Sequence, residues 1–319
     1  MLSDKRIVVT GGHGFLGSYV VDELRSRGCK YLGFPTHDIY DLRERSSVRA
    51  MMRDFKPDVI IHAAAHCGGI GLNKERPAEL FYDNMMMGLL MIDEAHEYGV
   101  EKFVQLGTVC EYPKFAKAPF LEEEIWNGYP EETNAPYGIA KKALLVQGQA
   151  YRQQYGFNVI HLLPVNLYGP RDNFNPASSH VIPALIRRFA EAKQQNLPGV
   201  EIWGTGRASR EFLYVKDAAE AIVDAVEQYN SADPINIGTG SEITVDSLVS
   251  LIANKIGYQG QIIFDFTKPD GQPRRCLDTQ KARDAFGFLA KTGLEEGLDK
   301  TIDWYMTSKK TRFPEGAEL

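Results

Sequence analysis

The sequence contains few cysteines, and none of them stands in a paired motif. Cys29, Cys67, Cys110 and Cys276 are the only 4 among 319 residues, and they lie far apart. Without a C-x-x-C pair, their spacing supports neither a zinc site nor a disulfide framework. The sequence also lacks a charged-then-apolar leader, and it has no apolar run of the roughly 18–20 residues that span a membrane. We therefore expect a protein of the reducing cytoplasm, with no metal site and no membrane association.

The sequence also has no excess of positive charge. Lys and Arg number 36 against 42 Asp and Glu, which gives a formal net charge of −6. This balance argues against nucleic acid as a partner, and any bound nucleotide must be attracted by a local pocket. With 44% hydrophobic and 24% charged residues, the composition is that of an ordinary globular protein of one to three domains.

Short apolar runs alternate with longer amphipathic stretches along the first half of the chain. This alternation is typical of β-α-β units, and strands with little polar alternation are typical of a parallel sheet that is covered on both faces. The expected strands are Arg6–Thr10, Tyr31–Phe34, Val59–His62, Phe103–Leu106 and Val159–Leu163, and the expected helices are Phe15–Arg27, Ser47–Phe55, Pro77–Tyr98 and Pro136–Tyr155. The sequence therefore predicts an α/β fold with a Rossmann-type, doubly wound parallel sheet.

The pattern changes after Pro164. Tyr168–Asn175 is rich in turn-forming residues, and the next helix is expected only from about Val181 to Lys193. A strand at Glu211–Val215 and a helix at Asp217–Tyr229 then return the chain to the first domain. We expect a first domain at 1–165 and 211–240, and a smaller α/β lobe at 166–210 and 241–319. No Pro/Gly/Ser-rich linker separates them, which favours two interleaved lobes with a ligand cleft between them.

A glycine-rich turn follows the first expected strand. Gly11, Gly14 and Gly17 form a G-x-x-G-x-x-G pattern, and Phe15 begins the helix that the turn opens into. Such a turn brings backbone N–H groups and a helix N-terminus close to a pyrophosphate. The pattern predicts that the first domain binds a dinucleotide, which leaves the smaller lobe for the substrate.

The second strand should distinguish between the two nicotinamide dinucleotides. An acid at its end would hold the ribose 2′-hydroxyl of NAD, whereas a basic residue there would accommodate the 2′-phosphate of NADP. No acid directly follows Tyr31–Phe34, while His13, His37 and Arg43 are nearby basic residues. We therefore favour NADP(H), with NAD(H) still open, and expect Asp41 to lie beside the adenine.

Tyr137 and Lys141 are four residues apart on an expected helix, so the phenol and the ammonium group share one face. A nearby ammonium group and the positive ring of the cofactor would favour phenolate and lower the pKa of Tyr137, which makes it a candidate acid/base group. Thr108, at the end of the fourth strand, offers a hydroxyl that could orient a carbonyl substrate.

These residues resemble the extended short-chain dehydrogenase/reductases that act on nucleotide sugars, and the resemblance covers nearly the whole chain. The three glycines match the cofactor loop of that superfamily, and Thr108, Tyr137 and Lys141 match its catalytic triad. Further segments are similar to the GDP-L-fucose synthases, the 3,5-epimerase/4-reductases of GDP-4-keto-6-deoxymannose: Ala65–Ile70, Leu106–Lys114, Asn166–Phe174, Ser179–Leu185, Trp203–Gly206 and Lys268–Gly271. In contrast to the bacterial members, His13 and Pro35 stand where arginines help to hold the NADP phosphate.

The resemblance implies that Cys110 and His180 are the acid/base pair of epimerisation. A ketone at C4 acidifies the protons on C3 and C5, and inversion requires one group to remove a proton and another to return it on the opposite face. Reduction would follow at the same ketone, with Tyr137 as the proton donor. For the nucleotide, the resemblance points to Asn166, Arg188, Trp203, Arg210 and Arg275, with Arg187 as an alternative to Arg188. It also implies a homodimer, whereas we interpret Cys67 as a packing residue.

Three other functions remain open at this stage. A nucleotide-sugar 4-epimerase would retain tightly bound NAD. A reductase of another keto-sugar, such as a GDP-heptose or a 3,6-dideoxy sugar, would need the same Tyr137 and Lys141. A cofactor-sensing protein without turnover is a third possibility, which the complete set of Thr108, Tyr137 and Lys141 disfavours.

Overall fold

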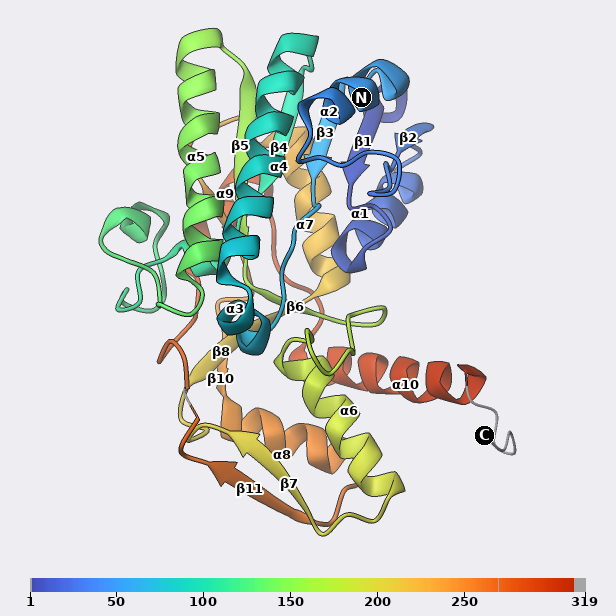
Figure 1. Ribbon diagram of the computed structural model, residues 1–319, viewed down its shortest axis with the longest axis vertical. Helices are drawn as coiled ribbons and strands as arrows, with labels where there is room; N and C mark the ends of the chain where they lie inside the picture. Colours follow the sequence, from blue (N-terminus) through green and yellow to red (C-terminus); the bar gives the residue numbers. More distant parts are fainter. Residues whose placement is uncertain (1, 269, 313–319) are drawn as a thin grey trace.

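A large parallel sheet forms the first lobe of the protein (Figure 1). The computed structural model describes residues 2–268 and 270–312, so Pro269 and the end of the expected second lobe at 313–319 lie outside the described residues. The sheet has 6 strands in the order β2-β1-β3-β4-β5-β9, all parallel. Its strands are β1 (Arg6–Thr10), β2 (Tyr31–Gly33), β3 (Val59–His62), β4 (Lys102–Leu106), β5 (Asn158–Pro164) and β9 (Ile235–Ile237).

Helices cover both faces of this sheet because its strands are apolar on both sides. On β1, Ile7 and Val9 pack into one buried cluster with α1 and α7, while Val8 packs into another with α2, α4 and α5. The helices are α1 (Phe15–Ser26), α2 (Arg45–Phe55), α4 (Pro77–Tyr98), α5 (Ala135–Tyr155) and α7 (Val215–Gln228). The predicted doubly wound α/β fold is thus confirmed. The chain runs from β1 to β2 on one side of β1 and then crosses to β3 on its other side, so the carboxyl ends of β1 and β3 flank the place where such sheets bind ligands.

The smaller lobe has a core of its own, built around α6 and α8. It contains two small sheets, β10-β8-β6 and β11-β7. Its elements are β6 (Asn166–Tyr168), α6 (Val181–Gln194), β7 (Gly199–Trp203), β8 (Ser209–Tyr214), β10 (Glu242–Thr244), α8 (Val245–Ile256), β11 (Gln261–Asp265) and α10 (Leu294–Arg312). The remaining helices are short: α3 (Ile70–Glu75), α9 (Gln280–Phe286), and the 3-10 turns Leu2–Asp4, Val109–Glu111 and Glu122–Trp126.

One expected strand lies in a different sheet from the one that the sequence suggested. The strand predicted at Glu211–Val215 exists as β8, but it pairs with β6 and β10 instead of joining the large sheet. Leu213 of β8 packs into the core of the first lobe, whereas Phe212 and Tyr214 pack into the core of the smaller lobe. Because both of its faces are buried, β8 links the two lobes, and α7 is the element that returns the chain to the first lobe.

Candidate active site

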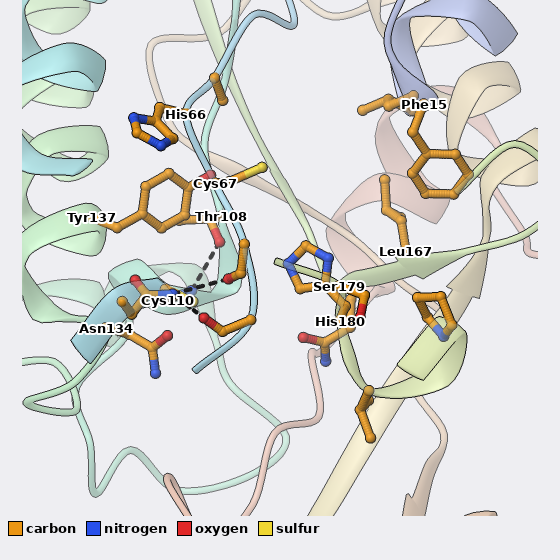
Figure 2. A pocket seen from close by; sticks show the side chains of 18 of the residues that line it. Phe15, His66, Cys67, Thr108, Cys110, Asn134, Tyr137, Leu167, Ser179 and His180 are labelled. Atoms are coloured by element: carbon orange, nitrogen blue, oxygen red, sulfur yellow. Dashed lines mark hydrogen bonds between the residues drawn. The ribbon is translucent and has the colours of Figure 1, made fainter. Parts of the chain in front are cut away.

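A deep cleft of about 1260 Å³ lies between the two lobes. The turns after β1, β3 and β4 and the start of α5 line it on the side of the large sheet, and α6, β7 and β8 line it on the other. Figure 2 shows Tyr137, Thr108 and Cys110 on one side of the pocket and the imidazole of His180 on the other. This volume exceeds the roughly 300–1,000 Å³ of an ordinary ligand pocket, and a cleft of this size has room for more than one ligand.

The glycine turn that lines the cleft permits close backbone approach. Gly11 has φ +69°, and a Cβ on it would lie 2.9 Å from the backbone of Ala64. A Cβ on Gly17 would lie 2.1 Å from the carbonyl oxygen of Gly11, so the helix start packs directly against the turn. Gly14 is the N-cap of α1, and no side chain caps that helix. The first amides of α1 thus have no side-chain partner, and the glycines leave the space beside them open. A pyrophosphate requires this arrangement.

The segment after β2 forms the far end of the same cleft. His13 and His37 both line it, and the ring of His13 lies edge-on against Phe34 with 5.3 Å between ring centroids. Asp41 is not among the described residues that line the cleft. Its carboxylate instead accepts hydrogen bonds of 2.9 and 2.7 Å from Arg43, and this ion pair lowers the pKa of Asp41 to about 2. Arg43 itself lines the cleft, and the place of Asp41 beside the adenine stays a prediction.

A buried carboxylate shapes the turn that carries Thr108 and Cys110. Glu111 is fully buried; its Oε1 accepts the backbone N–H of Thr108 at 2.8 Å and lies 3.2 Å from Nε2 of His161. The hydroxyl of Thr108 in turn accepts the N–H of Cys110 at 3.2 Å, as the dashed line in Figure 2 shows. A Cβ on Gly138 of α5 would lie 2.3 Å from the carbonyl oxygen of Cys110, so the turn packs directly on that helix. Glu111 was not predicted as a site residue, although it ends a T-x-x-E pattern that is typical of a capping box.

Tyr137 and Lys141 both line the cleft from α5. Burial raises the pKa of Tyr137 well above its usual value, and the neighbouring thiols of Cys67 and Cys110 add to this effect, while a hydrogen bond with Thr108 opposes it. Burial lowers the pKa of Lys141 to about 8. The expectation that Tyr137 has a lowered pKa is wrong for the chain by itself, because desolvation of the phenol outweighs the nearby ammonium group. Tyr137 therefore keeps its proton at neutral pH and can donate it.

His180 stands across the cleft at the start of α6. It is exposed in the cleft, where desolvation by the surrounding protein and, to a smaller extent, Arg275 lower its pKa. The segment is tied to the opposite side, because Gly69 donates its N–H to the carbonyl of Ser178 at 3.1 Å. Cys67, two residues before Gly69, has a free thiol exposed to the cleft. The interpretation of Cys67 as a packing residue is therefore wrong.

Arginines gather on the small-lobe side of the cleft. Arg210 donates hydrogen bonds to the carbonyls of Ser209 and Asp270 at 2.7 and 2.9 Å. Desolvation and the adjacent Arg275 lower the pKa of Arg210 to about 10, and desolvation and Arg187 lower that of Arg188. A bound anion would relieve the repulsion between guanidinium groups that lie this close together, so this side of the cleft is suited to phosphate groups.

Three comparisons with known proteins bear on this cleft. Residues 7–238 match the family described as the NAD dependent epimerase/dehydratase family. The chain belongs to that family. Its similarity to GDP-L-fucose synthase 1 of Arabidopsis thaliana is 42% identity over 307 residues, 96% of this chain and 95% of the relative. The predicted resemblance to the GDP-L-fucose synthases is confirmed.

Two solved structures are similar to this chain over nearly its whole length. A GDP-6-OMe-4-keto-L-xylo-heptose reductase from C. jejuni has a TM-score of 0.91 and 28% identity, covering 97% of this chain and 99% of the other. A GDP-L-fucose synthetase from Naegleria fowleri bound to NADP has a TM-score of 0.88 and 26% identity, covering 98% and 97%.

In this member of the epimerase/dehydratase family, the cleft brings together residues that are far apart in the sequence. Apart from Asp41, every predicted site residue lines it: Gly11, His13, Gly14, Phe15, Gly17, Thr108, Cys110, Tyr137, Lys141, Asn166, His180, Arg188, Trp203, Arg210 and Arg275. Arg187 also lines the cleft, but it forms an ion pair with Glu191 at 3.1 Å. Gln272, which the sequence analysis missed, accepts a 2.9 Å hydrogen bond from Arg275 and holds that buried guanidinium in place.

Proposed function

We propose that the protein is an NADP(H)-dependent epimerase/reductase that converts GDP-4-keto-6-deoxy-D-mannose to GDP-L-fucose. The observation that carries this proposal is the placement of Thr108, Tyr137 and Lys141 in the same cleft as Cys110 and His180. The first three residues are suited to reducing a ketone, and the last two to exchanging protons on its neighbouring carbons. The names of the relatives and of the NADP-bound neighbour support the same substrate and cofactor.

The reduction requires a proton donor beside the carbonyl oxygen of the sugar. NADPH, when bound at the glycine turn, supplies the hydride to C4. Tyr137 holds its proton at neutral pH and releases it to the oxygen as negative charge develops there. Thr108 donates a second hydrogen bond to this oxygen, and the ammonium group of Lys141 stabilises the phenolate that remains.

The epimerisation requires proton transfer on both faces of the sugar ring. Cys110 stands on the large-sheet side of the cleft and His180 on the small-lobe side, so a ring between them presents one face to each. The lowered pKa of His180 keeps its imidazole neutral and able to accept a proton. Each C–H bond that breaks at C3 or C5 leaves an enolate, whose oxygen meets the same hydrogen bonds from Tyr137 and Thr108.

The arginines provide the charge that holds the GDP group. We propose that Arg188, Arg210 and Arg275 bind the diphosphate, and that Asn166 and Trp203 position the sugar and the base. The ammonium group of Lys268 lies over the ring of Trp203 at 5.6 Å, and the indole is 46% exposed, which leaves part of it available for stacking. Asn166 is held by a 2.9 Å hydrogen bond to the carbonyl of Glu211 on β8.

We also propose a homodimer, formed through α4 and α5. These neighbouring helices carry large hydrophobic side chains on their outer surface, including Phe81, Tyr82, Val146 and Tyr155. A cytoplasmic location fits the free state of all four cysteines. Light scattering after size-exclusion chromatography should give twice the mass of the chain, and a monomer at micromolar concentration would contradict the dimer.

The experiment that tests the proposed function is incubation with GDP-4-keto-6-deoxy-D-mannose and NADPH. Absorbance should show that one NADPH is oxidised for each sugar consumed, and NMR should identify GDP-L-fucose as the product. If NADPH is not oxidised with this sugar, the proposal is wrong.

A C4 reductase of another GDP-sugar is the second candidate, and the 0.91 TM-score to the heptose reductase favours it. Such an enzyme would reduce its ketone without inverting C3 and C5. Reduction of GDP-4-keto-6-deoxy-D-mannose to a product that keeps the starting configuration at both carbons would therefore support the second candidate.

A further inference from the structure

A segment between β11 and α9 joins the two sides of the cleft. Residues 270–276, which we call the strap, run from the small lobe toward the first lobe (Figure 1). On the small-lobe side, Ser209 of β8 donates its N–H to the carbonyl of Pro273 at 3.0 Å. On the other side, Phe120 in the core of the first lobe donates its N–H to the carbonyl of Cys276 at 2.7 Å. The strap is therefore hydrogen-bonded to both lobes.

Gln272, in the middle of the strap, uses both ends of its side-chain amide inside the protein. The residue is only 2% exposed, and its Nε2 donates to the carbonyls of Pro113 and Lys114 at 3.0 and 3.2 Å. Its Oε1 accepts a hydrogen bond from Nε of Arg275 at 2.9 Å. An amide has two N–H donors, so neither is left for a ligand. Gln272 is thus built to position other groups instead of contacting the substrate.

The partners of Gln272 belong to different parts of the site. Pro113 and Lys114 stand three and four residues after Cys110, so they hold the end of the turn that carries it. Arg275 lines the small-lobe side of the cleft, and in the described part of the chain no hydrogen bond or ion pair occupies its Nη1 and Nη2. These two nitrogens are free to bind phosphate oxygens. One amide therefore connects the proposed diphosphate site with the catalytic turn.

We propose that Gln272 is a positioning residue that couples binding of the GDP diphosphate at Arg275 to the geometry of the turn with Thr108 and Cys110. This inference rests on the proposed function and identifies the link between its binding half and its catalytic half. Phosphate oxygens on Nη1 and Nη2 fix the guanidinium in one orientation, which aims its Nε–H at Gln272. The amide is then fixed against the two carbonyls, and the turn loses freedom. Part of the binding energy of the nucleotide is thereby used to hold Thr108 and Cys110 at the sugar.

The first test is amide hydrogen exchange, measured by mass spectrometry with NADPH present throughout and with or without saturating GDP. In the unmodified protein, GDP should slow exchange in peptides covering residues 107–116 by about threefold or more, because an ordered segment opens less often. Gln272→Met keeps the length of the side chain but removes all three hydrogen bonds. In this variant, GDP should still slow exchange in α6 but not in residues 107–116.

Two outcomes of this test would overturn the inference. If GDP does not slow exchange in residues 107–116 of the unmodified protein, nothing is transmitted to the turn. If GDP slows exchange there equally in Gln272→Met, the nucleotide acts on the turn without Gln272. A residue that only fills space would make exchange faster with and without GDP alike, and this result also contradicts the coupling.

Steady-state kinetics provide the second test. Gln272→Met should raise the KM for the GDP-sugar by about tenfold, because Arg275 loses its fixed orientation, and should lower kcat by about tenfold, because the turn is released. Gln149→Met is the matched control. The amide of Gln149 on α5 donates a hydrogen bond of 3.2 Å to the carbonyl of Ala232 and does not line the cleft. The control should keep both constants, and a change in KM alone in Gln272→Met would contradict the coupling.

A double variant shows whether Gln272 acts through Arg275. Arg275→Met breaks the same connection from the nucleotide end, so kcat should fall by about the same factor in Gln272→Met, in Arg275→Met and in the double variant. Losses of kcat that multiply in the double variant would show that the two residues act independently, against the inference.

The exchange measurements contain no sugar, so their failure is distinguishable from failure of the proposed function. If residues 107–116 respond to GDP through Gln272 but GDP-4-keto-6-deoxy-D-mannose is not turned over, the coupling stands and the proposed function is wrong. If the sugar is turned over but these residues do not respond to GDP, only the coupling is wrong.

Discussion

The two sides of the cleft are built in different ways. The first side carries Thr108, Cys110, Tyr137 and Lys141 on a buried turn and on α5, where Glu111 and close glycine contacts hold the backbone. The second side carries His180 and the arginines on the small lobe, where cations depress the pKa values of their neighbours. The first side is thus built for positional precision and the second for attracting negative charge. In the proposed mechanism, reduction needs proton donors from the first side alone, whereas epimerisation needs one residue from each side.

The largest expected effect comes from a substitution on the first side of the cleft, and it should separate reduction from epimerisation. Tyr137→Phe removes the proton donor and should lower the rate of NADPH oxidation by about 10²–10⁴-fold. Deuterium exchange at C3 and C5 in D2O should persist, although more slowly, because Cys110 and His180 remain and Thr108 still contacts the ketone oxygen. The measurement is stopped-flow absorbance combined with NMR of the recovered sugar. Equal losses of both reactions would show that the two steps do not have separate residues.

Cys110→Ser should have the opposite effect. A serine hydroxyl is a far weaker acid than a thiol, so it is a poor proton donor and hardly forms the anion that could accept a proton. Exchange at C3 or C5 should therefore fall by about 10²-fold or more, while the Kd for NADPH stays the same. NMR in D2O and a fluorescence titration measure the two quantities. Cys276→Ser is a control, because that thiol is buried outside the lining of the cleft. Unchanged exchange in Cys110→Ser would remove this residue from the mechanism.

A smaller effect is expected on the second side. Arg188→Met should raise the KM for the GDP-sugar by about 10–100-fold, the value of a lost charge-assisted hydrogen bond, with little change in kcat. Arg53→Met, on the exposed surface of α2, should leave both constants unchanged. A fall in kcat at constant KM would show that Arg188 acts on the reacting atoms instead of on the nucleotide.

The smallest expected effect is the pH dependence that comes from Lys141. Burial lowers the pKa of Lys141 to about 8, so the side chain is charged below this pH and neutral above it. Because the phenolate of Tyr137 needs this charge, kcat for reduction should fall by about tenfold between pH 7 and pH 9. The exchange reaction should not show this decline. A flat profile for reduction would mean that the charge on Lys141 is not required.

The lowered pKa of Lys141 also affects the stability of the folded protein, which should change with pH in the opposite direction to kcat. The unfolded chain protonates Lys141 up to a pH of about 10.5, whereas the folded protein releases that proton above a pH of about 8. The native state therefore binds fewer protons than the unfolded state between these two values, and the contribution of Lys141 to stability rises with pH across that window. The charged form that catalysis needs is thus the form that folding disfavours.

The two sides of the cleft also differ in how far the sequence predicted them. The bounds of β1, β3 and α4 were predicted to the residue, because each is a continuous apolar run or a long amphipathic stretch with clear ends. In the small lobe, the helix expected from Val181 to Lys193 was close to α6, but its further elements were not predicted, since its strands are short and pair with partners that sequence periodicity does not reveal. β8 shows the difficulty, because it reads as a strand of the large sheet but pairs with β6 and β10.

The individual site residues show the same limit. The glycine turn and the Tyr137–Lys141 pair are local patterns, and the structure places both in the cleft. The position of Asp41 is decided by Arg43, which is in turn held by Asp83, 40 residues further along the chain. A local sequence pattern cannot predict an ion pair between residues this far apart. It also cannot predict how deeply Tyr137 is buried. The direction of its pKa shift therefore required the structure.

The central claim is that residues from both sides of the cleft epimerise a ketosugar at C3 and C5 and that the same ketone is then reduced at C4. Product labelling in D2O tests this claim most directly. GDP-4-keto-6-deoxy-D-mannose and NADPH are incubated with the unmodified protein in D2O, and the isolated product is analysed by NMR and mass spectrometry. The account predicts GDP-L-fucose with solvent deuterium at both C3 and C5 and hydrogen from NADPH at C4. A reduced product without deuterium at C3 and C5 would contradict it, because Cys110 and His180 would then have exchanged no protons.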